Sequence, residues 1–232
     1  STPWTIREAG IYSLEKGRTH YTANAGVLEL RQEICHFLKR KYQIEYDPKS
    51  EVLVTVGGSE AIDLMIRCLI EPGDEVLIPE PSFVCYKPCT ELAGGVPVTI
   101  ETKEENNFCL TPDELRAHIT PKTKLLILPY PNNPTGGVLT KKDMEAIAEV
   151  LSETNIMVLS DEIYSALRYD EEGHIPFSAI PGMRERTVVI DGFSKAFAMT
   201  GWRLGYAYGP APIIKAMTKV HQYGIMSAPT TS

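Results

Sequence analysis

The sequence predicts a single α/β domain in which helices cover both faces of a mostly parallel sheet of about seven strands. Short, uniformly apolar runs alternate with amphipathic helical stretches along almost the whole chain. Strands this short and this apolar are typically buried on both faces, which is the environment of a parallel sheet between helices. We therefore expect a three-layer α/β/α arrangement, with no repeat and no linker to divide it.

The individual elements follow from the spacing of apolar residues. Val27, Leu30, Ile34, Phe37 and Leu38 recur at helical spacing and predict a helix near 26–42. Further helices are expected over the stripe that runs through 61–69 and near 82–93, 112–119, 140–154 and 211–222. Apolar runs predict strands at 52–56, 76–78, 96–100, 125–128, 157–159, 188–190 and 204–208. The connection over 190–204 has no crossover helix, so we expect the last strand to run antiparallel.

Composition narrows the classes of protein. The 232 residues are 43% hydrophobic and carry a net charge of −7, which argues against a nucleic-acid or anionic-membrane partner. No apolar run approaches the roughly 18 residues of a membrane span, and the first residues lack the pattern of a signal peptide. The five cysteines are an odd number without a Cys-x-x-Cys pair or a nearby histidine. We expect no metal site and a reducing, cytoplasmic location.

Polar and glycine-rich residues follow four of the predicted strands. They occupy 57–60, 129–136, 160–164 and 191–195. In open α/β sheets, ligands bind beyond the carboxyl ends of the strands. Four such loops on one rim predict a binding site there.

The residue types in these loops indicate a ligand that carries both an anionic group and a cationic group. Gly57, Gly58 and Ser59 lead into a helix, whose free N–H groups and dipole favour an anion such as phosphate, although glycines at such a junction also serve the turn itself. Lys195 has no acidic neighbour in sequence and is either a surface charge or a desolvated lysine able to form a Schiff base. Asp161 ends an apolar strand, where it either caps the next segment or pairs with a cation such as a protonated pyridine nitrogen.

Three further residues have both a structural and a functional interpretation. Arg203 follows Trp202, on which it could stack, or it could bind phosphate in a bidentate manner. Phe83 is either a core residue or a platform for a ring. Asn133 lies in an Asn-Asn-Pro turn.

Taken together, these segments resemble the class I/II aminotransferases, the aspartate aminotransferase family of fold-type I enzymes that depend on pyridoxal 5′-phosphate (PLP). The matching stretches are 21–26 with Leu30-Arg31, 57–61, 132–136, 160–164, and 192–195 with 200–203. They occur in the order of the family and at similar intervals, from near the first residue to about residue 210. The resemblance implies the large, PLP-binding domain of fold-type I.

The resemblance also implies roles for individual residues. Lys195 would form the Schiff base with PLP and then act as the base that moves a proton between Cα and C4′ of the cofactor. Asp161 would keep the pyridine nitrogen protonated. Tyr164 and Asn133 would hydrogen-bond the 3′-oxygen of the ring, and Phe83 would stack on its face.

The phosphate of PLP would be held by a separate group of residues. They are Gly58, Ser59 and Glu60, through backbone N–H groups, and Arg203. Tyr21 would reach the phosphate of a partner subunit, because sites in this family lie at the interface of a homodimer. The implied substrates are an amino acid and a 2-oxo acid.

Two features depart from the family pattern. Many relatives carry serine three residues before the lysine, where this sequence has Gly192. Family chains are also longer, with an N-terminal arm and a C-terminal small domain that supplies the arginine for the substrate carboxylate. We therefore expect residues 1–232 to be a truncated large domain that cannot transaminate by itself.

The sequence leaves three functions open. The leading interpretation is an aminotransferase. A C–S lyase or an aminocyclopropane-carboxylate-synthase-like enzyme would share the same core motifs. A PLP-binding regulatory domain without catalysis is the third, although the sequence has no basic helix-turn-helix segment.

Overall fold

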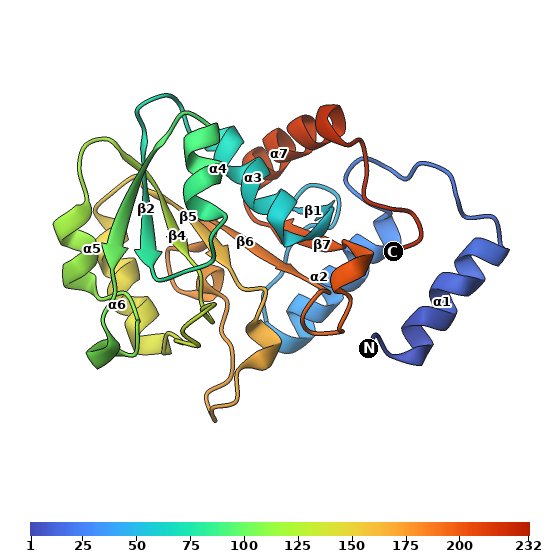
Figure 1. Cartoon of the computed structure of the whole chain (residues 1–232), viewed down its shortest axis with the longest axis horizontal. Helices are drawn as coiled ribbons and strands as arrows, with labels where there is room; N and C mark the ends of the chain where they lie inside the picture. Colours follow the sequence, from blue (N-terminus) through green and yellow to red (C-terminus); the bar gives the residue numbers. More distant parts are fainter.

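The computed structural model describes residues 1–232 and contains one seven-stranded sheet flanked by helices (Figure 1). The strands are β1 (Val52–Thr55), β2 (Glu75–Glu80), β3 (Val96–Glu101), β4 (Thr123–Leu128), β5 (Met157–Asp161), β6 (Thr187–Gly192) and β7 (Gly205–Tyr208). The α-helices are α1 (Trp4–Glu15), α2 (Leu28–Tyr42), α3 (Gly57–Leu69), α4 (Tyr86–Leu92), α5 (Pro112–His118), α6 (Lys141–Ser152) and α7 (Ala211–Gly224). Five short 3-10 helices lie at 104–106, 165–167, 177–179, 184–186 and 200–202. All seven predicted strands and the six predicted helices are confirmed.

The order of strands in the sheet is β1-β7-β6-β5-β4-β2-β3. The pairs among β2 to β6 are parallel, whereas β7 runs antiparallel to both of its neighbours, β6 and β1. The connection between β6 and β7 contains only the 3-10 helix at 200–202 and no crossover helix, which accounts for this reversal. The predicted antiparallel last strand is therefore confirmed.

Both faces of the sheet are covered, as the apolar strands predicted. On one face, α3 and α7 pack against alternate strand residues such as Leu53 and Ile127. On the other face, α5 and α6 cover the β2–β4–β5 half and α2 covers the β1–β7 half. Val52 and Val54 point to this second face and Leu53 to the first, which is the alternation expected of a strand buried on both sides.

Helix α1 was not predicted, and it stands apart from the sheet in Figure 1. None of its residues is buried, and Trp4, Ile11, Tyr12 and Leu14 are about half exposed. It approaches the rest of the domain at Gly10, where an added Cβ would be 2.8 Å from the Trp202 ring. The helix therefore lacks the buried apolar stripe by which the other helices were recognised.

The arrangement of strands brings the polar loops to one rim. β1, β4, β5 and β6 run in the same direction, so the loops that follow them share one edge of the sheet. No helix combines the length and the apolar character that crossing a membrane requires. All five cysteines are free thiols.

Candidate cofactor site

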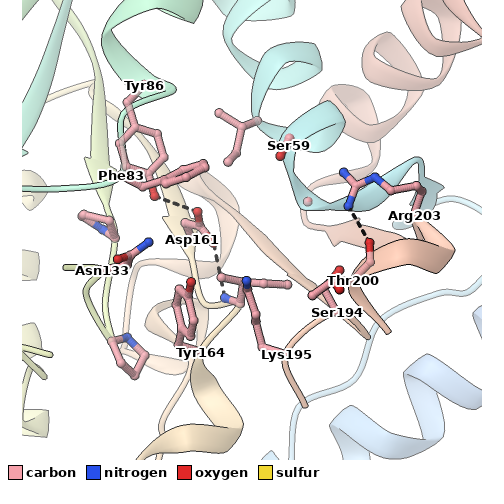
Figure 2. A pocket seen from close by; sticks show the side chains of 15 residues that line it. Ser59, Phe83, Tyr86, Asn133, Asp161, Tyr164, Ser194, Lys195, Thr200 and Arg203 are labelled. Atoms are coloured by element: carbon pink, nitrogen blue, oxygen red, sulfur yellow. Dashed lines mark hydrogen bonds between the residues drawn. The ribbon is translucent and has the colours of Figure 1, made fainter. Parts of the chain in front are cut away.

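A cavity of about 280 Å³ opens at this rim, and Figure 2 shows the side chains around it. Its lining consists of Gly58, Ser59, Ile62, Phe83, Tyr86, Pro129, Pro131, Asn133, Asp161, Ile163, Tyr164, Ser194, Lys195, Thr200 and Arg203. Eight of the ten residues predicted from the sequence are among them. Two are not, Glu60 and Tyr21.

Asp161 is a buried carboxylate at the end of β5, aimed into the cavity. Its Oδ2 accepts a hydrogen bond of 2.7 Å from the Tyr86 hydroxyl, and its Oδ1 accepts a 3.3 Å bond from the Ile163 N–H. Burial raises the pKa of Asp161, and these two donors only partly oppose that rise. No cation of the chain pairs with this carboxylate, so a cationic ligand group would stabilise its ionised form.

Tyr86 was missed by the sequence analysis. Its side chain is 2% exposed, and its hydroxyl is the nearest side-chain donor to Asp161 (Figure 2). Burial, and next the charge of Asp161, raise the pKa of Tyr86 well above its ordinary value, so it remains a donor. Tyr86 begins α4, whereas Phe83 lies before that helix, so no helical spacing in the sequence marked Tyr86 as a site residue.

Lys195 lies at the mouth of the cavity, next to Tyr164. Its Nζ is 5.5 Å from the centre of the Tyr164 ring, and it makes no ion pair within the chain. The lysine is exposed to solvent, so the desolvated environment considered from the sequence is wrong for this structure. The reason is its position after β6 in an open loop, where the adjoining Ala196 and Phe197 are exposed as well.

Phe83 and Asn133 lie near Asp161 in the cavity lining (Figure 2). The Phe83 ring stands nearly perpendicular to the Tyr86 ring, with 6.1 Å between their centres and 81° between their planes. It is 38% exposed, so one of its faces is free to stack on a planar ligand. The Asn133 side chain makes no hydrogen bond within the chain and is available to a ligand.

The opposite end of the cavity is built from the start of α3 and from Arg203. Gly57 has a φ of +74°, and a Cβ there would lie 2.6 Å from Nη2 of Arg203. Gly205 allows an equally close approach, because its Cβ would lie 2.6 Å from the backbone nitrogen of Gly58. The first N–H groups of α3 have no partner within the helix, and Val56 provides no side-chain cap. Exposed N–H groups, the helix dipole and a guanidinium together suit a phosphate.

Arg203 is held by the loop that precedes it. Its Nη1 donates a 3.0 Å hydrogen bond to the carbonyl of Thr200, and its backbone adopts the left-handed region at a φ of +55°. The indole Nε1 of Trp202 donates a 3.2 Å hydrogen bond to the Thr2 hydroxyl. The guanidinium is thereby placed beside Gly57.

Gly192, the departure from the family pattern, has a local steric reason. A Cβ at this position would lie 2.9 Å from the Cα of Gly205 and 3.2 Å from the Leu204 carbonyl. β6 and β7 approach too closely at this point for a serine side chain. Gly192 accordingly does not line the cavity.

Glu60 and Tyr21 lie outside the lining. The Glu60 carboxylate turns back to the N–H of Val56 and to His221, away from the cavity. Tyr21 is 82% exposed, in the segment between α1 and α2. Its position does not conflict with the prediction that it reaches the site of a partner subunit.

Comparisons with known proteins agree with this fold. The family described as aminotransferase class I and II matches residues 2–232. The chain is 50% identical over 228 residues to YugH of Bacillus subtilis, covering 98% of this chain and 59% of that protein. It is 46% identical over 222 residues to the aromatic-amino-acid aminotransferase 2 of Thermococcus litoralis, covering 96% of this chain and 57% of that protein.

Solved structures give the same result. The aromatic aminotransferase from Pyrococcus horikoshii OT3 superposes with a TM-score of 0.97 at 46% identity, covering the whole of this chain and 62% of that one. The aspartate aminotransferase of Thermus thermophilus, solved with maleate, superposes with a TM-score of 0.95 at 40% identity. This chain covers 59% of it. The architecture is that of the large domain of fold-type I aminotransferases, and the chain belongs to the aminotransferase class I and II family.

Two general properties accompany this family. Its members generally depend on PLP, and they act on amino acids and 2-oxo acids, generally as dimers. The chain spans about three fifths of the length of the relatives it matches.

Proposed function

We propose that the protein to which this chain belongs is a PLP-dependent aminotransferase, which moves an amino group between an amino acid and a 2-oxo acid. The observation that carries this proposal is Asp161, a buried carboxylate that faces the cavity with neutral donors alone. A protonated pyridine nitrogen supplies the missing cation. When bound, PLP supplies an electron sink for the charge that develops on Cα of the substrate.

The two ends of the cavity hold two different parts of the cofactor. Arg203 and the N–H groups of Gly58 and Ser59 bind its phosphate. Asn133 and Tyr164 hydrogen-bond the ring oxygen at the opposite end, and Phe83 covers a face of the ring. The spread of these residues over several strand ends fixes the cofactor in one orientation.

Lys195 is the residue that reacts with PLP and that transfers a proton during the reaction. Its Nζ lies beside Tyr164 in the cavity lining, where it would be within reach of both the cofactor and a substrate. There it moves a proton between Cα of the substrate and C4′ of the cofactor. Tyr164, whose ring lies beside this ammonium, orients it.

The organisation of the whole protein is also part of the proposal. Residues 1–232 form the large domain, and an N-terminal arm and a C-terminal small domain complete the protein, as the coverage of three fifths of its relatives supports. Two copies form a homodimer, in which the exposed Tyr21 of one subunit reaches the phosphate of the other. A cytoplasmic location is supported by the five unpaired cysteines.

The test is a donor panel with the full-length protein, PLP and several 2-oxo acid acceptors. We expect amino-group transfer that requires both an amino donor and an acceptor. Release of ammonia and a 2-oxo acid from a sulfur-containing donor without any acceptor would identify a lyase instead. Binding of PLP without any turnover would identify a regulatory domain.

A further inference from the structure

His221 is a fully buried histidine at the end of α7, far in sequence from the cofactor site. Its side chain is 0% exposed, and its Nδ1 lies 2.7 Å from Oε1 of Glu60. Glu60 belongs to the first turn of α3, the same turn that offers its N–H groups to the cavity. The contact therefore joins the last turn of one helix to the anion-binding turn of another.

The Glu60 carboxylate makes a second contact, within its own turn. Its Oε2 accepts the N–H of Val56, the residue that precedes Gly57. Glu60 is the fourth residue of α3 and reaches back to the N-cap N–H much as a glutamate at the third position does in a capping box. With His221 on one oxygen and Val56 on the other, the carboxylate is held outside the cavity lining.

A Glu60 side chain that lost this restraint would oppose anion binding in two ways. It would be free to turn toward the N–H groups of Gly58 and Ser59, which attract any nearby carboxylate. It would also repel a phosphate dianion bound to those groups. Restraint of this carboxylate is thus required for the phosphate site to remain available.

The packing of His221 indicates that the side chain is not present for stability alone. Because Nδ1 faces a carboxylate, it carries a hydrogen and donates it. The other nitrogen, Nε2, is buried without any hydrogen-bond partner. A buried polar atom without a partner destabilises a fold, so an apolar side chain would serve packing at least as well.

We infer that His221 is a positioning residue for the phosphate site, which it keeps available by holding Glu60 on the N–H of Val56. This inference rests on the proposed function, because the anion in question is the phosphate of PLP. His221 touches neither the cofactor nor the substrate. Its effect is therefore specific to ligands that carry a phosphate.

The test compares PLP with pyridoxal, which lacks the phosphate, in full-length wild-type protein and three variants. His221→Leu removes the donor, His221→Asn retains an N–H for Glu60, and Met217→Ala removes buried atoms of the same helix without touching Glu60. For His221→Leu we expect PLP affinity to fall roughly 10- to 100-fold, the effect of losing a hydrogen bond to a charged group. Its pyridoxal affinity and its melting temperature should be retained.

The other variants give the expected contrast. His221→Asn should restore most of the PLP affinity, and Met217→Ala should lower the melting temperature while leaving the ratio of PLP to pyridoxal affinity as in the wild type. Unchanged PLP affinity in His221→Leu, or equal losses for PLP and pyridoxal, would overturn the inference.

A lyase or a regulatory domain would still bind PLP, so the comparison with pyridoxal would remain valid for them. Failure of the PLP-binding part of the proposed function would give a different result, in which the wild type itself binds no PLP. Titration with inorganic phosphate then still tests the role of His221 in anion binding. Weaker phosphate binding by His221→Leu than by the wild type would support that role. Equal phosphate binding by the two proteins would overturn it.

Discussion

The two ends of the cavity are constructed differently. The ring end rests on side chains that are already bonded, since Asp161 is 6% exposed and is held by the Tyr86 hydroxyl and the Ile163 N–H. The phosphate end consists of main-chain N–H groups and an exposed arginine, with close approaches at Gly57 and Gly205. The ring end is therefore preorganised by burial, whereas the phosphate end depends on backbone conformation and on contacts such as that between His221 and Glu60.

This difference predicts how each end responds to substitution. Loss of a buried charge at the ring end removes an interaction that no neighbouring group can replace. Loss of one group at the phosphate end leaves several other donors in place. Changes at the ring end should therefore affect turnover, and changes at the phosphate end should affect affinity.

The largest expected effect is that of Asp161→Ala. Losing the partner of a buried cation costs on the order of 3–5 kcal/mol, which corresponds to at least two decades of rate if the interaction acts in the transition state. Some PLP should still bind through the phosphate end. The measurement is turnover together with PLP affinity in the full-length protein, with the exposed Asp170→Ala as control. Near-normal transamination by Asp161→Ala would show that this carboxylate only caps the turn at Ile163.

The next effect concerns Asp191, a buried carboxylate of β6 that accepts hydrogen bonds from the Ser165 hydroxyl and the Gly192 N–H. Burial raises the pKa of Asp191 from 3.8 to about 7. Because the pKa is higher in the folded state, stability is fully present below the unfolded pKa and is lost as the pH rises through about 7. Relative to the wild type, Asp191→Asn should therefore become more stable by up to about 3 kcal/mol between about pH 5 and about pH 8.

Urea denaturation of both proteins at the two pH values checks this prediction. Asn cannot ionise, so the difference in unfolding free energy between the two proteins should grow with pH. A difference independent of pH would mean that Asp191 titrates at its ordinary pKa.

The smallest effect in this series is that of Tyr86→Phe. The hydroxyl donates to Asp161, and a hydrogen bond to a charged group contributes roughly 1.5–3 kcal/mol, so turnover should fall on the order of tenfold. Its loss should also raise the pKa of Asp161, and the acid limb of the pH–rate profile should move to higher pH. Tyr130→Phe, which removes a buried hydroxyl bonded to Leu110 and Phe108, should leave that limb unchanged. An unshifted profile in Tyr86→Phe would make its contact with Asp161 incidental.

Much of the fold could be predicted because burial on both faces leaves a plain signal in sequence. Each strand is a short apolar run, and the lack of a crossover helix before β7 predicted its reversed direction. Helix α1 could not be found in this way, because it buries none of its residues and has no apolar stripe facing a core.

The residues of the site also differ in whether the sequence could predict them. Asp161 ends a strand, and Lys195 and Asn133 lie in loops that follow strands, so the topology of the sheet brings them together. Tyr86 and His221 act through partners 75 and 161 residues away in the chain, and no local pattern marks such pairs. The exposure of Lys195 could not be predicted either, since it depends on a loop conformation and not on neighbouring residue types.

Lys195 is the residue proposed to react with PLP, and the assignment of the other site residues depends on it. The decisive measurement is borohydride reduction of the full-length protein with bound PLP, followed by peptide mapping of the pyridoxyl label. We expect the label on Lys195, in the peptide that contains Ser194 and Ala196. A label found instead on another lysine, such as Lys215 or Lys219 on α7, would contradict the assignment of the site.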